Sequence, residues 1–121
     1  MTDAYVFDTY ALIEIIKGNQ NFKRFEQATV IINPFIFAEI CYYLLKIDSA
    51  KALEAARIYR KHISLTSPKQ IFDAMVMRLK HKKNNLSTAD CVSYIQAQSR
   101  GVPFLTGDGG LEGMPGVEFV K

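Results

Sequence analysis

The sequence contains little of what indicates a membrane protein, a disulfide-bonded scaffold or a zinc site. No apolar run approaches the ~20 residues that a membrane-spanning helix requires, and no segment resembles a signal peptide. Cys41 and Cys91 form no CxxC motif, and two thiols are too few for a disulfide framework. His62 and His81 lie on separate basic segments and are typical of surface residues. We therefore expect a cytoplasmic protein with reduced thiols and no membrane association.

A large excess of either charge is also lacking. Fifteen Lys and Arg against twelve Asp and Glu give a formal net charge of +3. This excess is compatible with a polyanionic partner but does not require one. The chain has no linker, internal repeat or low-complexity tract, and its 121 residues suffice to bury a hydrophobic core. Residues 1–121 are therefore predicted to form a single domain.

Short apolar runs alternate with segments of helical periodicity. The runs that predict strands are residues 4–7, 28–33, 63–67, 102–106 and 117–121. The segments that predict helices are residues 10–17, 21–27, 35–47, 50–62, 68–82 and 87–100. Strands that alternate with helices indicate an α/β fold with a mainly parallel sheet. We predict an α/β/α sandwich whose central sheet has about five strands.

Four carboxylates follow strands or begin helices in this arrangement. Asp8 ends the first strand, and Asp108 follows the strand at residues 102–106. Glu39 lies about one turn into the helix after the second strand, and Asp90 lies in the first turn of the helix at residues 87–100. Ligand sites of open parallel sheets lie at the carboxyl ends of the strands. We therefore expect the four side chains to meet at one edge of the sheet.

Each acid also has a purely structural interpretation. Asp8 can cap the helix that follows it, and Asp90 has capping-box spacing to Ser87. Asp108 lies in a glycine-rich turn, where Asp is common. A surface salt bridge is poorly supported for Glu39, because its neighbours are apolar. If the four acids do meet, their mutual repulsion favours a divalent cation, and Mg²⁺ or Mn²⁺ suits hard oxygen ligands.

Four segments carry a pattern that extends beyond the acids. They are YVFDTYALIEII (residues 5–16), INPFIFAEI (32–40), LSTADCVSYIQAQSRGVPFLTGD (86–108) and GVEFVK (116–121). In order and spacing they resemble the PIN domain family and, within it, the VapC-type ribonucleases. Cys91 departs from the Ala that is usual there, and DGGLEG after the last acid is richer in glycine than is common.

The resemblance implies a metal-dependent endoribonuclease that hydrolyses RNA phosphodiester bonds with one or two Mg²⁺ or Mn²⁺ ions. It assigns catalysis and metal binding to Asp8, Glu39, Asp90 and Asp108. Thr9 and Thr106 would orient these carboxylates, and Glu112 would either be an additional ligand or face solvent. The resemblance further implies the toxin of a type II toxin–antitoxin pair, which forms a homodimer and is blocked by an antitoxin protein.

Basic residues on two helical segments are candidates for contacts with RNA phosphates. They are Arg57, Arg60, Lys61, Lys80, Lys82 and Lys83. The same residues can equally form solvated helix faces. Tyr42, Tyr43 and Tyr59 can contribute to a dimer or antitoxin surface, or lie half-buried against the core.

Two other functions are compatible with the pattern. The first is a PIN fold that acts as an RNA-binding or interaction module with little catalytic activity. The second is a phosphotransfer domain built around Asp8, which is disfavoured because Asp8 lacks the second acid of a D-x-D motif. A nuclease assay with and without a divalent cation separates these functions from the hydrolase.

Overall fold

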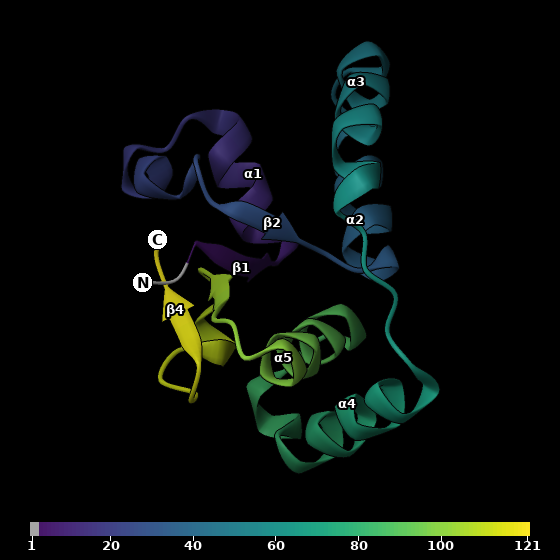
Figure 1. Ribbon diagram of the computed structural model, residues 1–121, viewed down its shortest axis with the longest axis vertical. Helices are drawn as coiled ribbons and strands as arrows, with labels where there is room; N and C mark the ends of the chain where they lie inside the picture. The colour runs from purple at the N-terminus through teal and green to yellow at the C-terminus, as the bar shows by residue number, and fades with distance from the viewer. Residues whose placement is uncertain (1–2) are drawn as a thin grey trace.

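A four-stranded parallel sheet forms the centre of the protein (Figure 1). The computed structural model describes residues 3–121. The strands are β1 (Ala4–Phe7), β2 (Thr29–Ile31), β3 (Phe104–Thr106) and β4 (Val117–Phe119), in the order β2-β1-β3-β4. All three pairings are parallel, with Val6 opposite both Ile31 and Phe104. The parallel sheet predicted from the sequence is confirmed.

The segment predicted as a third strand, residues 63–67, is not a strand. It touches the sheet at a single parallel bridge between Ile32 and Ile63. The Ile32 N–H donates to the His62 carbonyl (3.1 Å), and the Ser64 N–H donates to the Ile32 carbonyl (2.8 Å). Ser67 already caps the next helix, so the backbone turns away from the sheet within a few residues. The sheet therefore has four strands where about five were expected.

Within residues 3–121, five α-helices and four short 3₁₀ helices connect the strands. The α-helices are α1 (Thr9–Lys17), α2 (Pro34–Leu45), α3 (Ser49–Tyr59), α4 (Pro68–Lys80) and α5 (Thr88–Arg100). The 3₁₀ helices are η1 (Gln20–Phe25), η2 (Arg60–His62), η3 (Lys82–Asn84) and η4 (Gly109–Leu111). Side-chain caps begin the α-helices at Asp8, Asn33, Asp48, Ser67 and Ser87. Left-handed glycines end α1 and α5, as the sequence predicted.

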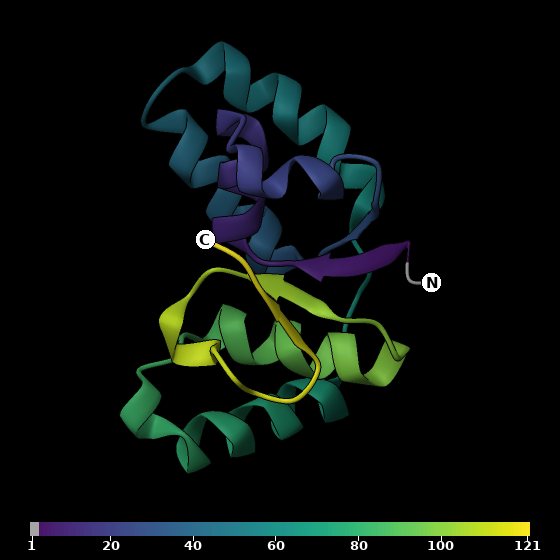
Figure 2. The same cartoon turned by 90° about the vertical axis from the view of Figure 1, so that its left-hand side faces the viewer.

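The helices cover both faces of the sheet, so the predicted α/β/α sandwich is confirmed (Figure 2). Phe7 and Leu105 point to the face that is covered by α1, α2 and α3. Val6 and Phe104, their neighbours in the same strands, point to the face that is covered by α4 and α5. This alternation explains why the strands are almost entirely apolar in sequence. None of the helices within residues 3–121 is long and apolar enough to cross a membrane.

Candidate active site

The carboxyl ends of β1 and β3 open into a surface depression of about 460 Å³. Its lining comes from the start of α1, the start of α5, the loop after β3 and the segment after β4. The lining residues are Asp8, Thr9, Tyr10, Ser87, Asp90, Gly107, Asp108, Gly109 and Lys121. Three of the four predicted acids therefore line one depression, although they come from widely separated parts of the chain.

Asp8 is the most buried acid of the depression, with an exposed fraction of 3%. Its Oδ1 accepts a hydrogen bond from the Ala11 N–H (2.8 Å), which caps α1, and its Oδ2 accepts one from the Thr106 hydroxyl. Burial raises the pKa of Asp8 to about 7, although the two hydrogen bonds lower it. The charges of Asp90 and Asp108 contribute to the rise to a lesser extent. The ionised form of Asp8 is therefore poorly compensated by the protein alone.

The loop after β3 presents Asp108 beside Asp8. The Thr106 hydroxyl, which donates to Asp8, also accepts a hydrogen bond from the Asp108 N–H (3.0 Å). Asp108 Oδ1 accepts one from the Gly110 N–H (3.0 Å), so the turn predicted from the sequence is present. Gly107 packs so closely that a Cβ there would lie 2.2 Å from Cε1 of Tyr10. The chain can pass beneath the Tyr10 ring only because residue 107 has no side chain.

Asp90 is held by a capping box at the start of α5. Its Oδ2 accepts from the Ser87 N–H (2.9 Å), and the Ser87 hydroxyl accepts from the Asp90 N–H (3.0 Å). Arg78 of α4 anchors the preceding residues by donating to the Leu86 carbonyl (3.1 Å). Burial raises the pKa of Asp90, the hydrogen bonds with Ser87 lower it, and the charges of Asp108 and Glu39 raise it further. Asp90 is therefore within electrostatic reach of two other acids.

Glu39 lies beside the depression and is not among the residues that line it. It is on α2, where its Oε1 accepts a hydrogen bond from the Thr9 hydroxyl. Of the two threonines predicted to orient carboxylates, Thr9 thus contacts Glu39 and Thr106 contacts Asp8. The charge of Glu39 contributes to the raised pKa of Asp90, so Glu39 interacts electrostatically with the acids that line the depression.

The donor chemistry of the depression suits a hard divalent cation. Within residues 3–121, no three His, Cys, Asp or Glu side chains are close enough to hold a metal ion by themselves. Mg²⁺, however, commonly binds through one or two carboxylates and completes its coordination with water and substrate phosphate. Buried carboxylates with raised pKa values, such as Asp8 and Asp90, are stabilised by such a charge. The residues present therefore fit Mg²⁺ or Mn²⁺ bound by few protein ligands.

The other predicted site residues lie outside the lining of the depression. Glu112 is exposed and follows η4. The six basic candidates are all exposed: Arg57 is on α3, Arg60 and Lys61 on η2, Lys80 on α4, and Lys82 and Lys83 on η3. Asn84, at the end of η3, donates to the Gly110 carbonyl (2.9 Å). Of the six basic candidates, Lys82 and Lys83 are on the helix that this contact joins to the loop that carries Asp108.

Five lining residues were not among the site residues predicted from the sequence: Tyr10, Ser87, Gly107, Gly109 and Lys121. Tyr10 follows Asp8 by two positions, in the first turn of α1, and Lys121 follows β4. The Lys121 carbonyl accepts a hydrogen bond from the Asn21 side chain (2.7 Å), which fixes the backbone at this point. The sequence contained a signal for Lys121, because a parallel last strand must end at the same edge as β1 and β3.

Fold and site together define the class of protein. The sequence profile of the PIN domain family matches residues 5–117, so the chain belongs to the PIN domain family. The family resemblance inferred from the sequence is thereby confirmed. No curated protein matches the sequence.

Solved structures with this fold include several toxins. A toxin–antitoxin complex from Klebsiella pneumoniae gives a TM-score of 0.73 at 20% identity, over 94% of this chain and 95% of that one. VapC20 from Mycobacterium tuberculosis, a sarcin–ricin loop cleaving toxin, gives a TM-score of 0.77 at 16% identity, over 97% of this chain and 99% of that one. VapBC2 from Rickettsia felis, bound to a DNA fragment from its promoter, gives a TM-score of 0.69 at 16% identity, over 98% of this chain and 99% of that one. At these identities the likeness shows the fold alone.

Proposed function

We propose that the protein is a metal-dependent endoribonuclease that hydrolyses RNA phosphodiester bonds. The observation that carries this proposal is the depression in which Asp8, Asp90 and Asp108 converge from separate parts of the chain. The charges of Asp90 and Asp108 contribute to the raised pKa of Asp8, and the charge of Asp108 contributes to the raised pKa of Asp90, so a bound cation would stabilise the ionised carboxylates. RNA as the substrate is supported by the shared fold with VapC20, which is described as cleaving the sarcin–ricin loop.

Asp8, Asp90 and Asp108 would hold one or two Mg²⁺ or Mn²⁺ ions, with one or two carboxylates to each ion and water or RNA phosphate as the remaining ligands, and Glu39 would bind a metal ion or a metal-bound water. A bound divalent cation would neutralise the phosphate, activate water and stabilise the leaving oxygen. Thr106 and Ala11 orient the Asp8 carboxylate, and the Ser87 backbone orients that of Asp90. Asp8 must give up its proton for cation binding, so activity should rise with pH around its pKa of about 7.

Lys121 and Tyr10 would hold the RNA strand at the depression. Lys121 supplies a positive charge on the rim of an otherwise acidic surface, and forms no ion pair within residues 3–121. The Tyr10 ring offers a surface on which a base can stack. Lys82 and Lys83 on η3 would extend the phosphate contacts, because η3 is bonded to the loop after Asp108 through Asn84.

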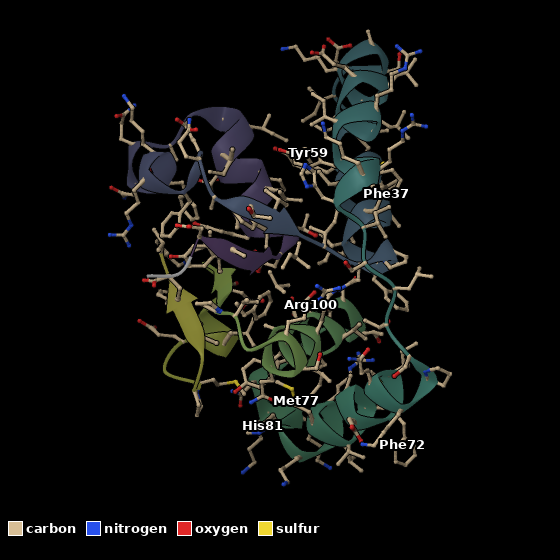
Figure 3. The ribbon with its side chains drawn as sticks, viewed as in Figure 1. Phe37, Tyr59, Phe72, Met77, His81 and Arg100 are labelled. Carbon is tan, nitrogen blue, oxygen red and sulfur yellow. The ribbon has the colours of Figure 1, made fainter. Side chains whose placement is uncertain are left out.

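An antitoxin partner is part of the proposal, since two of the similar structures are described as toxin–antitoxin complexes or VapBC pairs. Large apolar side chains are exposed along α2, α3 and the turn between them: Tyr42, Leu45, Ile47, Leu53 and Ile58. Exposed apolar clusters of this kind mark surfaces that bind partners. Tyr43 and Tyr59, in contrast, pack against the buried cluster, and Tyr59 lies on the side of α3 that faces α1 (Figure 3). Ile47→Lys should weaken antitoxin binding and leave RNA cleavage unchanged.

A homodimer would form through α4. Phe72, Val76 and Leu79 are 68%, 48% and 72% exposed and share one side of the helix. Phe72 points away from the rest of the protein (Figure 3). Leu79→Glu should convert the dimer into a monomer in light scattering.

The alternative function is a PIN-fold module that binds RNA or a protein with little catalysis. An assay on a fluorogenic RNA, run with Mn²⁺, with Mg²⁺ and with EDTA, separates the endoribonuclease from the binding module. The assay is run at cytoplasmic pH, because we expect this single-domain protein to act in the cytoplasm. The endoribonuclease cleaves with either metal and stops with EDTA. Binding of the RNA without metal-dependent cleavage would overturn the proposed function.

A further inference from the structure

A buried cluster of polar side chains joins α2 to α5. Its members, Asn33, Ser93 and Gln96, are 0%, 0% and 2% exposed. Asn33 caps α2, because its Oδ1 accepts from the N–H groups of Phe35 (3.0 Å) and Ile36 (3.1 Å). Its Nδ2 donates to Ser93 Oγ (3.0 Å) and to Gln96 Oε1 (3.1 Å), both on α5. The Asn33 side chain thus caps one helix and is hydrogen-bonded to a second helix.

Gln96 extends the cluster to the edge of the sheet. Its Nε2 donates to the carbonyl groups of Ile32 (3.3 Å) and Ser64 (3.2 Å). Both amide side chains of the cluster therefore have partners for their oxygen and their nitrogen. Because hydrogen bonds are directional and unpaired buried amides are costly, such a complete cluster favours one arrangement of the two helices. Apolar side chains in the same place would allow the helices to shift against each other.

The two helices that the cluster joins are the ones that carry Glu39 and Asp90. Every side-chain hydrogen bond between residues 29–45 and α5, within residues 3–121, involves Asn33 or Gln96. Asp90 lies one turn before Ser93 on α5, and Glu39 lies in the second turn of the helix that Asn33 caps. The cluster therefore controls how the two carboxylates stand relative to each other across the edge of the depression.

We propose that Asn33 and Gln96 are positioning residues, which hold Glu39 and Asp90 in the relative placement that binding of a divalent cation requires. The inference rests on the proposed metal-dependent function. Neither residue lines the depression, so both act through the helices that they join. Groups that hydrogen-bond directly to metal ligands commonly change metal affinity by about 10- to 100-fold when they are removed, and residues that act one step further away should give effects at the lower end of this range.

The test is a double-mutant cycle on Mn²⁺ affinity, measured by calorimetry without RNA. The four proteins are the wild type, Gln96→Met, Glu39→Gln and the double variant. Methionine keeps the length of the side chain and removes its hydrogen bonds. We expect Gln96→Met to weaken Mn²⁺ binding about tenfold in the wild-type background, and to have almost no further effect once Glu39 is Gln. Equal weakening in both backgrounds, or none in either, would overturn the proposal.

Ser99→Ala is the matched control, because the Ser99 hydroxyl joins α5 to α4 through Gln70 (2.8 Å) and does not involve α2. It should leave Mn²⁺ affinity unchanged. If circular dichroism shows that Gln96→Met does not fold, the same cycle is carried out with Asn33→Ser in its place. Serine keeps the cap of α2 and removes the Asn33 amide that donates to α5. If the wild type binds no Mn²⁺, the proposed function fails and the positioning role with it; if it binds and the cycle is additive, only the positioning role fails.

Discussion

The hydroxyl of Thr106 donates a hydrogen bond to the carboxylate of Asp8, although the two residues are 98 positions apart in the chain. The bond connects the ends of β3 and β1, which are neighbours in the sheet. The same hydroxyl accepts from the N–H of Asp108, so two acids that line the depression are linked through the Thr106 oxygen. Parallel pairing is what brings acids from both ends of the sequence to one edge.

The buried Asp8 carboxylate should make stability depend on pH. Its pKa is about 7 in the folded chain against an ordinary 3.8, so the folded state keeps a proton that the unfolded state loses between these values. In EDTA, the free energy of unfolding should therefore fall as pH rises from about 4 to about 7. Asp8→Asn removes this loss and should be more stable than the wild type at pH 8, because a pKa difference of about three units corresponds to several kcal/mol. Urea unfolding at pH 5 and pH 8 measures the difference.

The control for this prediction is Asp73→Asn, which alters an exposed acid paired with Lys69 on α4. It should leave the pH dependence as in the wild type. Mn²⁺ at pH 8 should raise the melting temperature of the wild type, because it binds the folded state, and should not raise that of Asp8→Asn. A wild-type stability that rises between pH 4 and pH 7 would show that Asp8 is not the buried, uncompensated acid described here.

Gly107 and Gly109 provide a matched pair for testing the loop after β3. A Cβ at residue 107 would lie 2.2 Å from the Tyr10 ring and 2.5 Å from the Val120 carbonyl, whereas one at residue 109 would meet nothing within 4 Å. Gly107→Ala should therefore displace Asp108 and Tyr10, lower the melting temperature and reduce kcat for RNA cleavage at least tenfold, roughly as loss of an outer-shell partner does. Gly109→Ala should keep the wild-type melting temperature, although Gly109 also lines the depression. Equal effects of the two substitutions would contradict the close packing at Gly107.

Lys121 should contribute more to RNA binding than the basic residues of α3 and η2. Affinity can be measured against salt concentration in an inactive Asp90→Asn background. Lys121→Gln should weaken binding and reduce the salt slope by about 1, as expected for one lost phosphate contact. Arg57→Gln together with Arg60→Gln should have a smaller effect, since neither residue lines the depression. A larger effect of the arginine pair would move the RNA path to the α3 side of the protein.

Much of the fold was predictable because its signals are local. Asp48 and Ser67 cap helices with their own side chains, and Gly18 and Gly101 take up the left-handed conformation that ends them. The apolar runs before Asp8 and Asp108 indicated strands, and the structure buries these strands on both faces. The convergence of Asp8 and Asp108 then followed from one rule, that parallel strands end at a common edge, whereas Asp90 begins a helix that no strand directly precedes.

Features that depend on the packing of distant segments were not predictable. Residues 63–67 have the composition of a strand, yet the start of α4 draws them away from the sheet and leaves Leu65 82% exposed. The position of Glu39 beside the depression depends on how α2 packs on α5. That packing is set by Asn33 and Gln96, which are 63 positions apart. No periodicity in the sequence indicates such a contact.

The most direct test of the account is single-turnover cleavage of a fluorogenic RNA in Mn²⁺ by the wild type and four variants. They are Asp8→Asn, Asp90→Asn, Asp108→Asn and, as the control, Asp73→Asn. The account predicts that each of the first three lowers the cleavage rate by more than about 100-fold, beyond the usual cost of losing an outer-shell partner. Asp73→Asn should retain the wild-type rate, and EDTA should abolish it. Wild-type rates in Asp8→Asn and Asp90→Asn, or cleavage that persists in EDTA, would contradict the central claim that these acids hold the metal that cleaves RNA.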